Sequence, residues 1–348
     1  FNSRLTGTID AYWNTTKDLL MKTAIPGITG FTSTYANVGQ TSNKGIEFAL
    51  QGVLVKTRDW NVTAGFNINF NRGKVDKLAD NVTGLYGTEW ATSSTFPKSD
   101  YVLKEGRPVG LVRGLTADGF YTTDDFTYEN GVYTLKEGVA DVSSAVFPNY
   151  HLHNGMNERP AGQLAYPGMA KFKDLNDDGI INDDDVDVIG DMTPVHTGGF
   201  NINATYKNFD LGLYFNWSYG NEIYNVNKLA ALYGYKEGAV YENKLSIVKD
   251  CYKIYDVVNG ELVALTTPEQ LNAANANAKL PLAYSENGYV STLGIEDGSY
   301  LRLNTLTLGY TLPKSMLQKA GISNLRVYGS IYNVFTITGY SGIDAEVS

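Results

Sequence analysis

The chain has 348 residues, of which 43% are hydrophobic, and it carries a formal net charge of −9. This negative charge argues against binding to nucleic acid or, by charge, to an anionic surface. A single cysteine, Cys251, excludes an internal disulfide framework and any cysteine-based zinc site. The sequence contains no run of about eighteen or more apolar residues, which excludes a transmembrane helix.

Apolar and polar residues alternate in several segments, and the alternation is clearest in residues 60–71. Phe66 and Phe70 fall on one side of an extended chain there, and Asn67 and Asn69 fall on the other. A period of two predicts a strand with one apolar face and one wet face. Because the wet face is neutral Asn, Thr and Gly rather than charged, we expect it to face the lumen of a wide membrane barrel.

The same alternation predicts seven strands in chain order. They cover residues 4–20, 38–56, 60–76, 195–206, 209–224, 299–312 and 324–338. Short polar turns alternate with long excursions between these strands, as the periplasmic turns and extracellular loops of outer-membrane barrels do. The excursions assigned to the extracellular side are residues 21–35, 78–194 and 225–298.

Two local features refine this plan. The apolar phase of the sixth strand changes after Leu303, which predicts a β-bulge near Asn304 or Thr305. Residues 100–122 have room for an extra hairpin. Only an even number of added strands keeps the short turns on one side and the long loops on the other, so we assign these residues to an extracellular extension. Aromatic residues near the strand ends are predicted to form interface girdles: Trp13, Trp60, Tyr206, Phe209, Trp217 and Tyr310.

The fold class that follows is all-β, an open and curved antiparallel sheet whose apolar side faces lipid. Seven strands cannot close a barrel with this much loop mass, so we expect the chain to be a portion of a larger barrel. Closure matters because unpaired backbone groups in lipid cost several kcal/mol each. The residues predicted to face lipid are Phe66, Ile68, Phe70, Phe200, Ile202, Leu211, Leu213 and Phe215. Those predicted to face the lumen include Asn67, Asn69, Asn201, Asn203, Glu47 and Arg302.

Several motifs follow one another in an order that resembles a known family. They are RLTGTIDAYW at 4–13, NVG at 37–39, NKGIEF at 43–48, YLRL at 300–303, LGY at 308–310 and NVF at 333–335. Over almost its whole length the chain resembles the SusC-like (SusC/RagA) TonB-dependent outer-membrane transporters of Bacteroidetes. By this resemblance, residues 1–348 are the C-terminal part of a plugged barrel of about 22 strands. The plug domain, TonB box, early strands and closing strand of the family are absent from the sequence.

The resemblance also implies a function. The family imports an oligosaccharide or a peptide across the outer membrane, with TonB opening the plug and a SusD-like lipoprotein covering the extracellular mouth. No local nucleophile–base pair and no phosphate-binding loop occurs in the sequence, so we do not expect an enzyme.

Residues 174–185 have the spacing of a calcium-binding loop, with Gly179 at the sixth position, where the chain must turn sharply. The ligands would be Asp174, Asn176, Asp178, the carbonyl of Ile180, Asn182 and Asp185. A Ca²⁺ ion there would be structural and would pin a long extracellular loop. The alternative is a solvated acidic turn, which Asp and Gly favour in exposed loops. Asp at the twelfth position, in place of Glu, has a shorter reach for bidentate closure.

Weaker candidates lie in the same loops. His151 and His153 would share one face of a strand, but no third metal ligand is evident, so ordinary loop histidines are the simpler interpretation. Residues 267–279 predict a short capped helix. The loops are also rich in tyrosine, which either stacks on sugar rings or packs the loops: Tyr121, Tyr128, Tyr133, Tyr150, Tyr166, Tyr233 and Tyr235.

Two other classes of protein remain as alternatives. One is a secreted β-rich carbohydrate-binding or carbohydrate-active protein in which residues 174–185 form a dockerin-like loop. A dockerin would carry a second such loop about twenty residues away, and none is present. The other is a structural or adhesive outer-membrane protein that does not transport.

Overall fold

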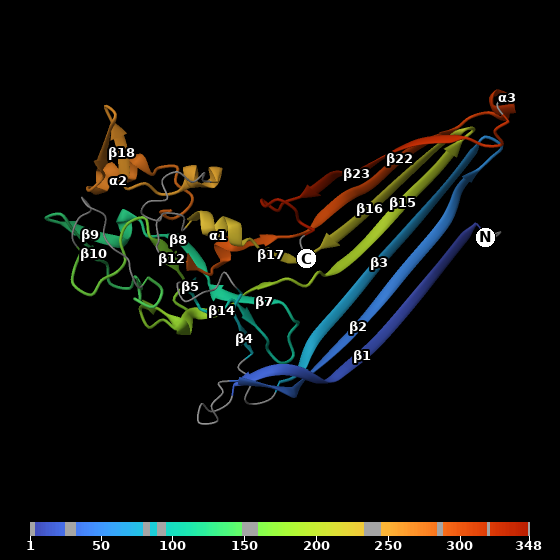
Figure 1. The fold of residues 1–348 in the computed structure, drawn as a ribbon. Coiled ribbons are helices and arrows are strands. Elements are labelled where there is room, and N and C mark those ends of the chain that lie inside the picture. The colour runs from blue at the N-terminus through green and yellow to red at the C-terminus, as the bar shows by residue number, and fades with distance from the viewer. Residues whose placement is uncertain are drawn as a thin grey trace.

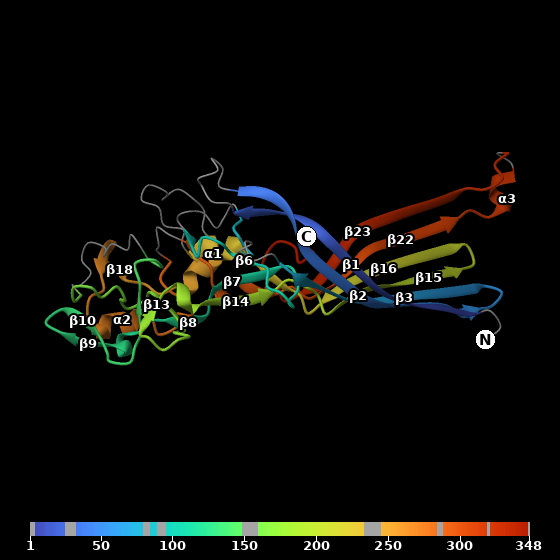
Figure 2. The same cartoon turned by 90° about the horizontal axis from the view of Figure 1, so that it is seen from below.

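The computed structural model describes residues 4–24, 33–78, 84–88, 95–147, 159–232, 245–283, 288–318 and 321–346. One open sheet of seven strands forms one end of the molecule, and a folded region of shorter elements forms the other (Figure 1). Figure 2 shows these two bodies following one another along the long axis. Within the described residues, no helix has the length and apolarity needed to cross a membrane.

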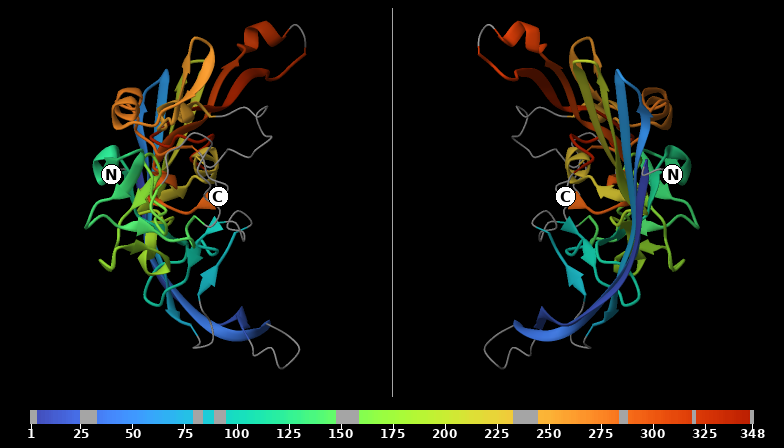
Figure 3. Two further views of the ribbon diagram at one scale, coloured as in Figure 1. Left: turned by 90° about the vertical axis from the view of Figure 1, so that its left-hand side faces the viewer. Right: turned by 90° about the vertical axis from the view of Figure 1, so that its right-hand side faces the viewer.

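The sheet is an antiparallel meander whose strand order follows the chain. Its strands are β1 (Leu5–Ala24), β2 (Ser33–Lys56), β3 (Trp60–Lys77), β15 (His196–Tyr206), β16 (Phe209–Tyr219), β22 (Tyr300–Thr311) and β23 (Arg326–Thr338). Figure 3, in which the sheet is viewed from its two ends, shows that it is curved and twisted. The predicted all-β antiparallel fold is therefore confirmed.

Two predicted boundaries are wrong. The excursion at residues 21–35 is shorter than expected because β1 continues to Ala24 and β2 begins at Ser33. The strand predicted over 209–224 ends at Tyr219, because Gly220 adopts a left-handed conformation with φ of 78°. Residues beyond that turn leave the sheet as β17 (Glu222–Tyr224), which pairs with β21 (Ile295–Asp297).

The predicted bulge is confirmed. The register of β22 shifts between Leu303 and Thr305 against β16 and against β23, so Asn304 has no direct partner in either ladder. Asn333 on β23 faces this point and adopts φ of 51°. Asn tolerates that left-handed conformation better than most residues, which allows both strands to bend at one level.

The register places the predicted apolar residues on one face of the sheet. Phe200 pairs with Phe66 on one side and with Phe215 on the other, and the Phe200 and Phe215 rings stack at 4.3 Å. Large side chains on this face are exposed, among them Ile9, Ile46, Phe48, Leu50, Phe66, Phe70, Leu308 and Ile331. A contiguous apolar face of this size is unfavourable in water and is typical of a surface covered by lipid.

Aromatic pairs border this face at the end of the short turns. Trp60 lies 4.5 Å from Tyr206, and Phe209 lies 4.7 Å from Tyr310, between ring centroids. From Trp60 to Phe70 the strand rises roughly 33 Å. With a barrel tilt of about 40°, that is a belt roughly 25 Å tall, the height of the apolar band of outer-membrane barrels.

The folded region beyond the sheet consists of short strands and helices. Its strands are β4 (Leu85–Tyr86), β5 (Thr95–Phe96), β6 (Tyr101–Val102), β7 (Leu111–Leu115), β8 (Ala117–Phe120), β9 (Phe126–Glu129), β10 (Val132–Leu135), β11 (Asp141–Val142), β12 (Ala170–Phe172), β13 (Ile180–Ile181), β14 (Val186–Asp191), β17, β18 (Tyr255–Val258), β19 (Glu261–Ala264), β20 (Gly288–Tyr289) and β21. Its α-helices are α1 (Val226–Leu232) and α2 (Pro268–Ala274), and α3 (Lys314–Leu317) lies in the turn at the opposite end of the sheet (Figure 1). Short 3₁₀ turns occur at Thr123–Asp125, Asp183–Asp185, Ser246–Asp250 and Thr292–Gly294.

The two long excursions of the chain build one common core in this region. The Leu115 amide donates to the Val290 carbonyl at 2.9 Å, and strand β5 of the first excursion pairs with β20 of the second. The rings of Phe172 and Tyr289 meet edge to face at 5.1 Å. From the sequence we predicted two separate loops, whereas in the structure the two excursions pack into one unit.

The capped helix predicted over 267–279 is confirmed in its shorter form as α2. Thr267 and Gln270 form a reciprocal capping box, and Pro268 occupies the first turn. Leu271 on this helix is fully buried in the common core. A local sequence signal and tertiary packing therefore favour the same element.

Candidate functional site

The polar face of the sheet carries a network of neutral hydrogen bonds. The Asn203 amide donates to the Asn201 side-chain oxygen at 3.1 Å, and the Tyr214 hydroxyl donates to Asn203 at 3.1 Å. On the neighbouring strands, the Tyr12 hydroxyl donates to Asn71 at 3.0 Å. Such groups bind water and hydrogen-bonding solutes without a fixed charge, as suits the wall of an aqueous lumen.

Arg302 is buried on this polar face, opposite Asn216. Its Nε donates to the Thr336 hydroxyl at 2.9 Å, and its terminal nitrogens form ion pairs with Glu346 and Asp344. The guanidinium therefore pins residues that follow β23 back against the face. Its predicted orientation, away from the apolar face, is confirmed, and its charge is balanced by nearby carboxylates.

A second ion pair lies at the end of the sheet that carries the short turns. Arg326 donates to both Asp210 oxygens, at 2.9 Å from Nε and 2.5 Å from Nη2, across the intervening strand β22. Gly309 lies between the two groups on β22, and a Cβ there would meet Asp210 and Arg326 atoms at 2.5–2.6 Å. The absence of a side chain at this position permits the bidentate contact.

In the acidic loop, residues 174–185, side-chain oxygens accept hydrogen bonds from backbone amides of the same loop. Gly179, with φ of 85°, forms the sharp turn at the sixth position, and its amide donates to Asp174 at 2.7 Å. The Ile180 amide donates to Asp178 at 2.9 Å, and the Asn176 side chain donates to Asp178 at 3.0 Å. These turns gather the oxygens of the first three predicted ligands close together.

Asp185 closes the loop from inside the protein, where it is fully buried. One carboxylate oxygen accepts from the Leu175 amide at 2.7 Å, and the other accepts from the Asn182 amide at 2.8 Å. The Asn182 side chain in turn accepts from the Asp184 amide at 2.8 Å. Across the described part of the chain, no group of three or more His, Cys, Asp or Glu side chains is arranged to hold a metal ion.

Most of the loop tyrosines that the structure describes pack the interior. Tyr121, Tyr133 and Tyr166 are fully buried, and burial raises the pKa of the Tyr133 hydroxyl far above its usual range. Tyr128 is partly buried and its ring lies 4.6 Å from that of Tyr133. For these three buried side chains, the interpretation that they stack on sugar rings is therefore wrong, and they pack the loops instead. Outside the described residues lie His151, His153, Tyr150, Tyr233 and Tyr235.

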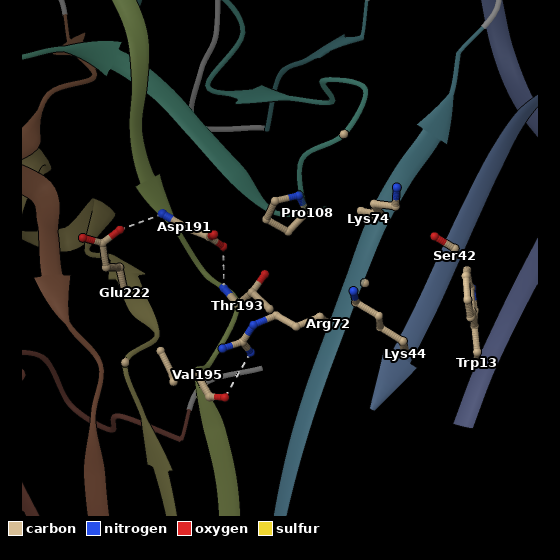
Figure 4. A pocket seen from close by; sticks show the side chains of 13 residues that line it. Trp13, Ser42, Lys44, Arg72, Lys74, Pro108, Asp191, Thr193, Val195 and Glu222 are labelled. Carbon is tan, nitrogen blue, oxygen red and sulfur yellow. Dashed lines mark hydrogen bonds between the residues drawn. The ribbon is translucent and has the colours of Figure 1, made fainter. Parts of the chain in front are cut away.

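Sequence reasoning missed one feature, a row of side chains across β1, β2 and β3 (Figure 4). Trp13 pairs with Lys44, and Lys44 pairs with Arg72. The row lies beside a cavity of about 650 Å³ that Lys74 and Val195 also line. The signal was present in the sequence, because Lys44 lies two residues before Ile46 and Arg72 two residues after Phe70, in phase with the apolar positions.

Relatives of known class cover the whole chain. It is 30% identical over 351 residues to TonB-dependent receptor P3 of Formosa agariphila, which spans 100% of this chain and 29% of that protein. It is 27% identical over 354 residues to TonB-dependent receptor SusC of Bacteroides thetaiotaomicron, spanning 99% and 28%. The structure of the RagAB peptide transporter aligns with a TM-score of 0.67 and 25% identity, over 99% of this chain and 31% of that one. No family model matches the chain.

The fold, the apolar belt and these relatives define a class, the β-barrel proteins of the bacterial outer membrane. Within that class, the chain is similar over its whole length to TonB-dependent receptors, SusC among them. Both the predicted family and the predicted outer-membrane location are confirmed. The relatives are receptors and transporters rather than enzymes, and the chain spans about three tenths of the length of those it matches.

Proposed function

We propose that this chain supplies wall strands and an extracellular region to a TonB-dependent importer of an oligosaccharide or a peptide. The observation that carries the proposal is the sheet itself, with an exposed apolar face and a neutral hydrogen-bonding face. A lumen wall of Asn, Thr and Tyr accepts many polar solutes, whereas a strongly charged wall would select by sign. The relatives named as TonB-dependent receptors support the energy source.

The folded region lies on the extracellular side in this proposal. Short turns join the strands at the opposite end, for instance between Lys56 and Trp60 and between Tyr206 and Phe209. Outer-membrane barrels place short turns in the periplasm and long loops outside. The common core built from both excursions then forms a rigid body above the mouth.

That body is the part of this chain suited to contact a SusD-like lipoprotein. The exposed hairpin of β18 and β19 projects from it, with Val257 and Leu262 exposed. Among the relatives, the solved structure of RagAB is described as a peptide transporter, and the sequence relative SusC is described as a TonB-dependent receptor. A peptide and a glycan are therefore both kept as substrate classes.

A growth and uptake experiment tests this function. Deleting the gene that encodes this chain should abolish TonB-dependent uptake of one substrate class, when peptide and glycan mixtures are supplied separately. Complementation with the intact gene should restore uptake, whereas complementation in a strain without TonB should not. Normal uptake of both classes after deletion would favour a structural or adhesive role. Co-purification of a surface lipoprotein tests the partner.

The secreted alternative does not fit the sheet. Phe66 and Leu308 are 42% and 54% exposed on a continuous apolar face, which a soluble carbohydrate-binding protein would have to bury. A structural Ca²⁺ ion at residues 174–185, proposed below, does not require a dockerin.

A structural Ca²⁺ ion in the acidic loop is a second part of the proposal. Carboxylate and amide oxygens from Asp174, Asn176 and Asp178 converge there, and hard oxygen ligands suit Ca²⁺. When bound, the ion would offset the repulsion among neighbouring carboxylates. The buried Asp185 carboxylate already ties both ends of the loop together through the Leu175 and Asn182 amides.

Metal analysis and thermal unfolding test the ion directly. The purified protein should contain about one Ca²⁺ per chain at this loop, and chelation should lower the melting temperature of the folded region. Asp178→Asn should remove the ion, whereas Asp184→Asn, outside the ligand set, should keep it. Equal calcium content and stability in all three proteins would contradict the calcium site and favour a solvated turn.

A further inference from the structure

A row of one aromatic and two cationic side chains marks the edge of the apolar belt. Trp13, Lys44 and Arg72 lie side by side on β1, β2 and β3. The next row toward the short turns consists of Ala11, Ile46 and Phe70, all apolar. Side chains in both rows point to the same face, because they differ by two residues on each strand.

The two cations in this row face each other without a carboxylate between them. Lys44 is directly opposite Arg72 in the β2–β3 register, an arrangement in which like charges repel. Lys44 makes no hydrogen bond or ion pair with the residues that the structure describes. Arg72 donates only to backbone carbonyls, of Asn71 at 2.8 Å and of Pro194 and Val195 at 3.0 Å. Its positive charge is therefore held in place but not neutralised.

The acidic groups around the adjoining cavity are already engaged. Asp76 pairs with Lys74 at 3.2 Å and accepts from Ser42 at 2.8 Å. The side chain of Asp191 accepts from the Thr193 amide at 2.9 Å, and Glu222 accepts from the Asp191 amide at 2.6 Å. Each carboxylate thus has a local donor, and none of the three forms an ion pair with Lys44 or Arg72.

We infer that this row binds the phosphorylated headgroup of an outer-leaflet lipid. The site is continuous with the lipid-facing belt, so an acyl chain on Ile46 and Phe70 would bring its headgroup to Lys44 and Arg72. Arg and Lys are the preferred partners of phosphate oxygens, and a Trp at the same level suits the interface. Phosphorylated lipid A, the anionic lipid of the outer leaflet, has this combination of acyl chains and phosphate.

The cavity beside the row provides room for the headgroup. It measures about 650 Å³ and opens between Lys44, Arg72 and Lys74 on the sheet and Pro108 on the folded region (Figure 4). Arg72 joins the two bodies, because its guanidinium contacts the carbonyls at Pro194 and Val195 just before β15 begins. A bound phosphate would therefore bridge the sheet and the extracellular region at their junction.

This inference relies on the membrane orientation in the proposed function, and lipid analysis of the intact transporter tests both. The full native polypeptide is purified from outer membranes in mild detergent, and retained lipid A is quantified by mass spectrometry. Lys44→Gln should lower the retained phosphorylated lipid A about tenfold, the value of one charged hydrogen bond. Lys44→Arg should retain it. Because the Lys44 side chain makes no hydrogen bond or ion pair with the described residues, neither change should impair folding.

Lys56→Gln is the control, since Lys56 lies on the same strand as Lys44 but beyond the other end of the belt and on the polar face, where the register shift after Val53 pairs it with Asn61. It should leave lipid A unchanged. If Lys44→Gln retains lipid A fully, if enzymatically dephosphorylated lipid A binds equally well, or if millimolar inorganic phosphate displaces the lipid, the inference is overturned. An equal loss of lipid A in Lys56→Gln would show a non-specific effect of removing a lysine and would also overturn the inference. Substrate uptake should be intact in all three variants, so failure of import is read separately.

Discussion

The sheet and the folded region beyond it place the same kinds of residue in opposite positions. Phe66 and Leu308 are exposed on the sheet, whereas Leu229 and Tyr133 are fully buried in the region beyond it. The hydrophobic effect drives both arrangements, but the surroundings differ, because lipid accepts apolar side chains that water rejects. Exposed apolar side chains, which would destabilise a soluble protein, are therefore favourable on the lipid-facing side of the sheet.

Polar groups differ between the two parts in the same way. The sheet gathers neutral Asn, Thr and Tyr on one face and compensates Arg302 with Glu346 and Asp344. The folded region instead buries Asp100 and Asp185, each with two hydrogen-bond donors. Burying a charge without such partners would cost several kcal/mol in either part.

The largest expected effect comes from creating a cavity in the core of the folded region. Leu229→Ala should destabilise that region by about 2–5 kcal/mol, because the side chain is fully buried against Gly294. Hydrogen–deuterium exchange across α1 measures the local opening free energy. Leu308→Ala, on the lipid face, should cost clearly less, since lipid can fill the vacated space. Equal losses at both sites would remove the distinction between the two parts.

A charge placed in the belt tests the sheet directly. Phe66→Arg should destabilise the folded barrel by about 2–4 kcal/mol, because the position lies near the bilayer midplane. Asn67→Arg, one residue later on the polar face, should be far milder. Urea unfolding of the full transporter in lipid vesicles measures both variants. Similar losses at the two positions would contradict the assignment of the apolar face to lipid.

A smaller effect is expected where a glycine allows close packing within the belt. The Trp217 ring lies over Gly198, and an added Cβ would clash with that ring and with the Asn67 carbonyl. Gly198→Ala should therefore cost about 1–3 kcal/mol in the same unfolding assay. Gly329→Ala is the control, because no atom lies within 4 Å of a Cβ there. A neutral Gly198→Ala would show that the ring moves freely.

The smallest expected effect concerns a surface ion pair of the folded region. The Val188 amide and Lys104 lower the pKa of the Asp187 carboxyl below its ordinary value. A carboxyl with a lowered folded pKa adds stability above its unfolded pKa and loses it as the pH falls through the folded pKa. Asp187→Asn should cost at most about 1 kcal/mol near pH 7 and nothing in strong acid. A cost that persists unchanged in acid would exclude an electrostatic origin.

Local sequence determined much of the sheet. Period-two alternation located the strands and their apolar face, and the phase break after Leu303 located the bulge. These features follow from strand geometry, which depends only on neighbouring residues. The capping box of α2 was readable for the same reason. The resemblance to a family placed the segments in the outer membrane.

Only the tertiary structure decided which distant residues meet. It merged two excursions into one core, buried Tyr121, Tyr133 and Tyr166, and brought Glu346 to Arg302 across 44 residues. It also aligned Lys44 with Arg72, because the β2–β3 register sets their pairing. Alternation states which face a side chain occupies, but long-range packing and strand register decide its neighbours, and no local pattern encodes those choices.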